Sequence, residues 1–145
     1  MKKLKMISLL LFLWLPISVW ALEYPTLHYD KAILYDLTDD KVLYELKDKE
    51  KAHVASLTKI LTTITAIESI DNLDDMVTYT ENMKSLVRWD ASVAGLSVGD
   101  KVSYRDLLYA SILPSGADAT TALAISTSGS ISNFVKKMNE EASKI

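Results

Sequence analysis

Two residues in the first half of the chain could support nucleophilic catalysis, namely Ser56 and Lys59. A serine hydroxyl is a poor nucleophile near neutral pH, so it needs a neighbouring group that takes its proton. Residues three apart on a helix share a face, with Cβ atoms about 5–6 Å apart, so these two side chains can meet. A lysine acts as that base only when it is neutral, and burial or a helix N-terminus favours the neutral form.

The segment that follows predicts the helix that this pairing requires. Apolar residues lie one, four, five, eight and eleven positions beyond Ser56, on one helical stripe, which predicts a buried helix that begins at or near Ser56. They are Leu57, Ile60, Leu61, Ile64 and Ile67. The structural alternative is that Ser56 is the N-cap of this helix and Lys59 a solvated residue of its first turn. Because Ser-x-x-Lys is a common pattern, the catalytic interpretation needs support from the rest of the sequence.

The other segments predict a mixture of strands and helices. Residues 31–37 and 42–46 are rich in β-branched, leucine and tyrosine residues around a polar turn, which predicts a β-hairpin. A short strand within 74–80 precedes a helix over 81–87, with Thr80 as its cap.

The C-terminal part predicts a loop and three helices. The loop covers 91–101, and Ser103 begins a capping pattern for a helix over 105–113, which Pro114 ends before a turn at Ser115 and Gly116. Further helices are predicted over 118–125 and 131–145, separated by a flexible polar break over 126–130.

The first 21 residues predict a signal peptide. Three lysines precede an apolar run over 6–19, which leads to Ala21, a small residue after which a signal peptidase would cut. We therefore expect a domain over 22–145 that is exported to the periplasm or the outer face of the cytoplasmic membrane. In the alternative, the segment stays uncleaved and associates the chain with the membrane, although Pro16 interrupts it and it is short for a bilayer span.

Composition excludes several kinds of site. The sequence has no cysteine, which rules out disulfides, thiolate metal sites and a cysteine nucleophile. The two histidines, His28 and His53, stand in no recognisable Ser-His-Asp context. The net charge of −3 becomes −6 once the signal's three lysines are lost, and the remaining lysines form no basic stripe. We therefore expect no nucleic-acid partner.

Several separate segments resemble, in family order and spacing, the low-molecular-mass penicillin-binding proteins of peptidase family S11, which are serine D-alanyl-D-alanine carboxypeptidases. ASLTKILT at 55–62 is similar to their active-site helix. The other segments are AILYDLTDDKVLYE at 32–45, SVAGLSVGDKVSYRDLLYASILPSGADA at 92–119 and GSISNFVKKMNEEA at 129–142. The resemblance covers essentially all of the chain after the signal. It implies an α+β fold of the β-lactamase/DD-peptidase-like serine hydrolase type.

The resemblance implies catalytic roles for three residues. Ser56 would be the acylated nucleophile, which attacks the carbonyl between the two D-alanines of a peptidoglycan stem peptide, and Lys59 its general base. Ser115 would be the serine of the family's second motif, Ser-x-Asn, and would relay a proton toward the leaving D-alanine. Water would hydrolyse the acyl-enzyme, and β-lactams would acylate the same serine. The substrate-binding residues stay unassigned, and the resemblance implies no metal or cofactor.

The sequence departs from the family pattern at two places. Ala117 stands where the second motif usually ends in asparagine, whose amide would hydrogen-bond the lysine and the substrate. The third motif, Lys-Thr-Gly, does not occur in the sequence. We therefore expect an incomplete N-terminal part of the catalytic domain, truncated to the helical portion and the first hairpin, with an exposed sheet edge.

Two alternative functions stay open on the sequence. A serine β-lactamase shares Ser-x-x-Lys and, by resemblance, the fold, but it would release the hydrolysed drug quickly. A catalytically inactive exported remnant would bind muropeptide or a partner protein through the exposed sheet edge, and Ala117 with the absent third motif favours it.

Overall fold

The computed structural model describes residues 28–144, which divide between two compact units, with 28–51 in the first unit and 52–144 in the second. In the first unit, strands β1 (Ala32–Asp36) and β2 (Lys41–Leu46) form an antiparallel hairpin, with Ala32 opposite Leu46 and Asp36 opposite Lys41. The predicted hairpin is therefore confirmed. The predicted signal peptide over 1–21 lies outside the described residues.

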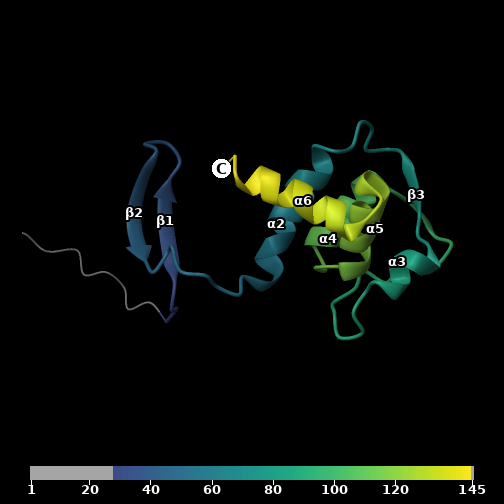
Figure 1. Cartoon of the computed structure of the whole chain (residues 1–145), viewed down its shortest axis with the longest axis horizontal. Coiled ribbons are helices and arrows are strands. Elements are labelled where there is room, and N and C mark those ends of the chain that lie inside the picture. The colour runs from purple at the N-terminus through teal and green to yellow at the C-terminus, as the bar shows by residue number, and fades with distance from the viewer. Residues whose placement is uncertain (1–27, 145) are drawn as a thin grey trace, which may run out of the picture. The chain divides into compact units, whose positions relative to one another are not determined.

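The second unit is mainly helical (Figure 1). Strands β3 (Met76–Thr78) and β4 (Lys101–Ser103) of this unit pair antiparallel, with Val77 opposite Val102, and the segment between them contains helix α3 (Glu81–Ser85). The elements in chain order are the 3₁₀ turn η1 (Ala55–Leu57), α2 (Thr58–Ile67), β3 (Met76–Thr78), α3 (Glu81–Ser85), β4 (Lys101–Ser103), α4 (Tyr104–Ile112), α5 (Ala117–Ser128) and α6 (Ile131–Ala142).

Helix α5 is the centre of this unit's core and contacts α2, α3, α4 and α6. It is made largely of alanine and threonine, whose small side chains let neighbouring helices approach closely. Its buried residues are Asp118, Ala119, Thr121, Ala122, Leu123 and Ala124. The surrounding elements complete the core with Ala66, Val77, Tyr79, Met83, Leu107, Leu108 and Phe134.

Two predicted helix caps are confirmed. Thr80 Oγ1 accepts a hydrogen bond from the backbone N–H of Met83 at 3.3 Å, at the start of α3. Ser103 Oγ accepts from the N–H of Asp106 at 3.1 Å, at the start of α4. Each cap satisfies a backbone donor that the first helical turn leaves unpaired. Strand β4, whose last residue is the cap Ser103, was not predicted.

The predicted polar break over 126–130 is wrong, because α5 continues to Ser128. Ser126 Oγ donates to the carbonyl of Ala122 at 2.6 Å, and Thr127 Oγ1 donates to that of Leu123 at 2.7 Å. The hydroxyls are thus satisfied inside the helix and do not compete with it. Gly129, with φ 74°, ends the helix in the left-handed conformation that glycine adopts without steric cost. The last helix, α6, ends at Ala142, and Ile145 lies outside the described residues.

Helix α2 confirms the predicted helix but reverses its predicted buried face. The side chains of Ile60, Ile64 and Ile67 on the apolar stripe are 55%, 38% and 48% exposed. The buried residues are Thr62, Thr65 and Ala66.

The buried threonines of α2 satisfy their own hydroxyl groups. Thr62 Oγ1 donates to the carbonyl of Thr58 at 3.2 Å, and Thr65 Oγ1 donates to that of Leu61 at 2.8 Å. These bonds remove the main cost of burying a hydroxyl, so the methyl groups can pack against the other helices.

Neither a membrane span nor a metal cluster is found within residues 28–144. No helix there has both the length and the apolar character to cross a bilayer. No group of three or more histidine, aspartate or glutamate side chains there is arranged to hold a metal ion.

The reversal of the α2 face is testable by truncating one side chain from each environment. On the buried face, Thr65→Ala shortens a side chain with 1% exposure and should lower the free energy of unfolding by about 1–3 kcal/mol. Ile60→Ala, on the exposed stripe, should change it by less than about 1 kcal/mol. Urea unfolding followed by circular dichroism measures both values, and equal losses would contradict the assignment of the buried face.

Candidate active site

Ser56 lies in the 3₁₀ turn η1, immediately before α2, and its side chain is exposed. The N-cap residue of α2 is Leu57, and neither η1 nor α2 has a side-chain cap hydrogen bond. The alternative in which Ser56 serves as the helix N-cap is therefore wrong. Its hydroxyl is available for other partners, at the positive end of the helix dipole, where a developing alkoxide would be favoured.

Lys59, in the first turn of α2, reaches back to Ser56. Its Nζ donates to Ser56 Oγ at 3.5 Å, a long hydrogen bond, and its side chain is half-buried. The spacing of three residues thus brings the two groups together, as predicted. Hydrogen bonds of this kind are often long in the absence of substrate and shorten when it binds.

Ser115 meets Ser56 although the two residues are 59 positions apart in the sequence. It lies in the short connection between α4 and α5, and its Oγ donates to Ser56 Oγ at 2.8 Å. Ser56 Oγ therefore accepts hydrogen bonds from both Ser115 and Lys59. All three residues that the sequence predicted as catalytic form one cluster, which could stabilise charge on the Ser56 oxygen and pass protons to or from it.

Two residues with a strained backbone lie in or next to this cluster. Ala55 and Ser115 have φ angles of 45° and 60°, in the left-handed region that non-glycine residues seldom adopt. Each such residue costs about 1–2 kcal/mol, so it persists only where the surrounding structure holds it in place. One of these residues precedes Ser56 and the other is Ser115 itself, which indicates that the fold imposes the position of both serines.

The turn that carries Ser115 is fixed by two backbone hydrogen bonds. The N–H of Gly116 donates to the carbonyl of Ala110 in α4 at 3.1 Å. The N–H of Ala117 donates to the carbonyl of Ser92 at 2.8 Å, which ties the first residue of α5 to the loop before β4. The Ala117 side chain is a half-buried methyl group, which offers no hydrogen bond to Lys59 or to a ligand.

Asp118 is a residue of this region that the sequence analysis missed as a candidate. Its carboxylate is 3% exposed and accepts four backbone hydrogen bonds. The donors are the N–H groups of Ala94 at 2.8 Å, Gly95 at 2.9 Å, Leu96 at 2.9 Å and Ala119 at 2.9 Å. An aspartate in the first turn of a helix is so common that the sequence alone gave no reason to single it out.

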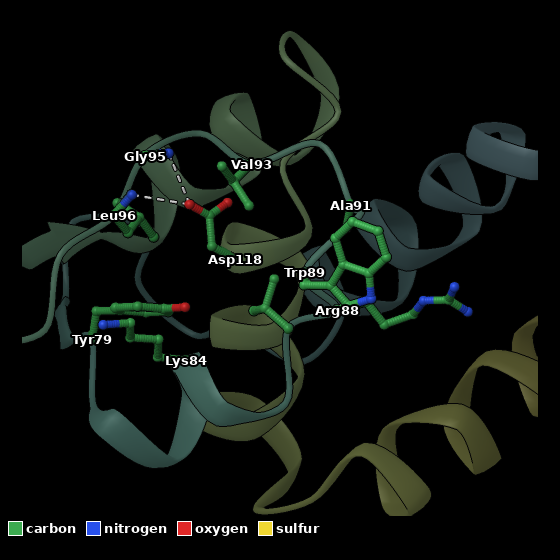
Figure 2. Close-up of a pocket in the computed structure, with 10 residues that line it drawn as sticks. Tyr79, Lys84, Arg88, Trp89, Ala91, Val93, Gly95, Leu96 and Asp118 are labelled. Atoms are coloured by element: carbon green, nitrogen blue, oxygen red, sulfur yellow. Dashed lines mark hydrogen bonds between the residues drawn. The ribbon is translucent and has the colours of Figure 1, made fainter.

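The buried Asp118 carboxylate stays ionised because of these donors. Burial by itself raises the pKa of the carboxyl group, but the backbone N–H groups outweigh burial and lower its pKa below the usual value. Figure 2 shows the carboxylate directed at the backbone of Gly95 and Leu96. The ionised carboxylate is therefore part of the folded structure, and its hydrogen bonds hold the loop over 94–96 in place.

A cavity of about 300 Å³ lies beside Asp118 (Figure 2). Tyr79, Lys84 and Trp89 are among the residues that line it. None of Ser56, Lys59 and Ser115 lines it. The cavity is thus separate from the serine–lysine cluster, and Asp118 is one of the residues that line it.

Gly116→Ala tests how tightly the Ser115 turn is enclosed. A Cβ atom at Gly116 would lie 2.6 Å from Ala110 O and 2.9 Å from Asp118 Oδ1, so the backbone would have to move. We expect a loss of about 1–3 kcal/mol in the free energy of unfolding, measured with urea.

Gly129→Ala is the matched control for this variant. Its Cβ would have open space, so only the left-handed backbone contributes, at about 1 kcal/mol. If Gly116→Ala were as stable as the unmodified chain, the turn would not be enclosed as described.

Comparison with known proteins places this geometry in one family. The family model for D-alanyl-D-alanine carboxypeptidases, peptidase S11, matches residues 19–145. Escherichia coli D-alanyl-D-alanine carboxypeptidase DacC is 36% identical over 148 residues, which cover 95% of this chain and 37% of that protein. The corresponding carboxypeptidase DacF of Bacillus subtilis is 33% identical over 118 residues, which cover 79% of this chain and 30% of that protein.

Solved structures agree with the sequence relatives. Penicillin binding protein 5 from Haemophilus influenzae is similar with a TM-score of 0.76 at 30% identity, over 86% of this chain and 37% of that one. The Streptomyces K15 DD-transpeptidase has a TM-score of 0.76 at 33% identity, over 83% of this chain and 49% of that one. The expected DD-peptidase-like fold is thus confirmed for the portion present. The chain spans 28% to 38% of the length of its curated relatives. It belongs to the peptidase S11 family of D-alanyl-D-alanine carboxypeptidases.

Proposed function

We propose that this chain carries the acylation centre of a serine D-alanyl-D-alanine carboxypeptidase, with Ser56 as nucleophile, Lys59 as general base and Ser115 as proton relay. The observation that carries the proposal is the convergence of Ser115 and Lys59 on Ser56 Oγ, at 2.8 Å and 3.5 Å. The substrate is a peptidoglycan stem peptide that ends in two D-alanines, the class of substrate that the relatives' names indicate.

The geometry supports an acyl-enzyme route. Ser56 Oγ attacks the carbonyl carbon of the bond between the two D-alanines, and its proton moves to neutral Lys59. The negative charge on the carbonyl oxygen is favoured near the N-terminus of α2. When the C–N bond breaks, the proton reaches the leaving amine through Ser115, and free D-alanine departs. Water then hydrolyses the ester on Ser56 and restores the hydroxyl.

β-Lactams would acylate the same serine, because their strained amide resembles the bond that is cut. Ala117 would weaken substrate positioning, since it supplies a methyl group where an amide would hold the substrate backbone. The proposed location is outside the cytoplasm, in the periplasm or at the outer face of the membrane, in keeping with a peptidoglycan substrate.

An inactive exported remnant that binds muropeptide or a partner protein is the second candidate. Ala117 favours it, because its methyl group cannot replace the hydrogen bonds of an asparagine. A serine β-lactamase is the third candidate, and it differs in how long the acyl group would stay on Ser56. The three candidate functions predict different results when the chain is incubated with a penicillin.

The intact mass of the whole chain after incubation with a penicillin tests the proposal. We expect an increase equal to one drug molecule, absent from Ser56→Ala. Lys59→Ala should slow acylation by about 10²- to 10⁴-fold, the usual contribution of a general base.

Lys136→Ala is the matched control for Lys59→Ala, since Lys136 is an exposed lysine of α6 whose side chain is 80% accessible, and it should acylate at the unmodified rate. A folded chain without an adduct would favour the inactive remnant. Rapid loss of the adduct with release of hydrolysed drug would favour the β-lactamase.

A further inference from the structure

The carboxylate of Asp118 joins two segments that border the Ser115 turn. Three of its four donors, Ala94, Gly95 and Leu96, belong to the loop before β4, and the fourth is in the first turn of α5. Figure 2 shows the bonds from Gly95 and Leu96. A carboxylate has only acceptor oxygens, so it can take all four bonds at once. An asparagine would turn an NH₂ group toward N–H donors and lose at least one pair of these bonds.

The loop that Asp118 anchors also holds the turn that carries Ser115. The Ser92 carbonyl, two residues before Ala94, accepts the Ala117 N–H at 2.8 Å. The space at Gly116 is bounded by the Asp118 carboxylate and by the loop residue Ala94, since a Cβ there would lie 2.9 Å from Asp118 Oδ1 and 3.0 Å from Ala94 Cβ. The turn therefore rests against both the carboxylate and the loop that the carboxylate holds.

Ser115 needs such support because its backbone conformation is unfavourable. With φ 60° it would relax toward a commoner conformation if its neighbours allowed the movement. A relaxation of about 1 Å at the Ser115 hydroxyl would break its 2.8 Å hydrogen bond with Ser56, and displacements of that size can slow a reaction about 100-fold.

We propose that Asp118 is a positioning residue, which holds Ser115 against Ser56 by anchoring the loop over 92–96 to the N-terminus of α5. This inference rests on the proposed function of the Ser56 cluster, and it adds a residue that touches neither substrate nor reacting atoms. Asp118 acts through the Ser115 turn and not through proton transfer, because its oxygens are occupied by backbone donors.

The test compares Asp118→Asn with Asp100→Asn in the whole chain. Asp100 is the matched control, because its Oδ2 accepts from the N–H of Ser97 at 2.8 Å in the same loop but has no bond to the Ser115 turn. The rate of hydrogen exchange at the Ala117 amide measures how firmly the Ser115 turn is held, and this measurement does not require catalytic activity. We expect exchange at least about 10-fold faster in Asp118→Asn and nearly unchanged in Asp100→Asn. Equal exchange in a folded Asp118→Asn variant would overturn the inference.

Acylation by penicillin gives the functional reading of the same variants. Asp118→Asn should slow acylation about 100-fold, and Asp100→Asn should stay within about 2-fold of the unmodified chain. In a Ser115→Ala background, Asp118→Asn should have almost no further effect, because it acts through Ser115. A similar slowing in both backgrounds would show a general structural role and overturn the inference.

A second, milder pair covers the case in which Asp118→Asn fails to fold. Gly95 and Gly99 have φ angles of 95° and 98°, and a Cβ at either would meet nothing within 4 Å, so alanine introduces similar strain at both. Only Gly95 donates to Asp118, whereas Gly99 donates to the carbonyl of Tyr79. Exchange at Ala117 should rise in Gly95→Ala and not in Gly99→Ala, and the same rise in both would overturn the inference.

The two readouts separate the inference from the proposed function. An unmodified chain that is never acylated would refute the proposed function, whatever the exchange rates. Acylation of the unmodified chain together with unchanged exchange at Ala117 in both test variants would refute only the role of Asp118.

Discussion

The buried carboxylate of Asp118 is the interaction on which the arrangement of the serine cluster depends. Four backbone N–H groups stabilise its charge and lower its pKa in spite of burial. A buried charge without such partners would be strongly unfavourable, so the loop over 94–96 and the start of α5 are fixed together. The Ser115 turn lies between these two segments. The loop and α5 therefore hold Ser115 where its hydroxyl bonds to that of Ser56.

Helix α2 positions the other two members of the cluster by a different route. Its buried face consists of Thr62, Thr65 and Ala66, and the helix packs against α4, α5 and α6. The threonine hydroxyls bond to carbonyls one turn earlier, so this face is effectively apolar. The positions of Ser56 and Lys59 therefore depend on buried threonines of α2, which a hydrophobicity pattern assigns to the surface.

Local signals in the sequence predicted local features correctly. The caps at Thr80 and Ser103 marked the starts of α3 and α4, and the spacing of Ser56 and Lys59 predicted their contact. The meeting of Ser56 with Ser115 could not be predicted from spacing, because they are 59 positions apart, and only the family resemblance placed them in one site.

The errors have a common physical origin in side-chain hydroxyls that bond to their own helix. Such bonds allowed α5 to run through Ser126 and Thr127, and they allowed threonine to face the core in α2. Asp118 was missed for a related reason, since three of its four partners are backbone groups 22 to 24 positions away that leave no pattern in the sequence. Hydrophobic periodicity records side-chain polarity, not whether a polar group finds a partner.

The convergence of Ser56 and Ser115 can be measured directly by replacing both with cysteine, because the sequence contains no other cysteine. A disulfide needs Cβ atoms about 3.5–4.5 Å apart, which is compatible with hydroxyl oxygens 2.8 Å apart. After mild oxidation, the folded double variant should lose both free thiols and 2 Da of mass, the two hydrogens given up to form one disulfide, while the same chain oxidised in urea should react far more slowly. Two thiols that stay free in a folded chain would show that the serines do not meet, and would contradict the catalytic cluster.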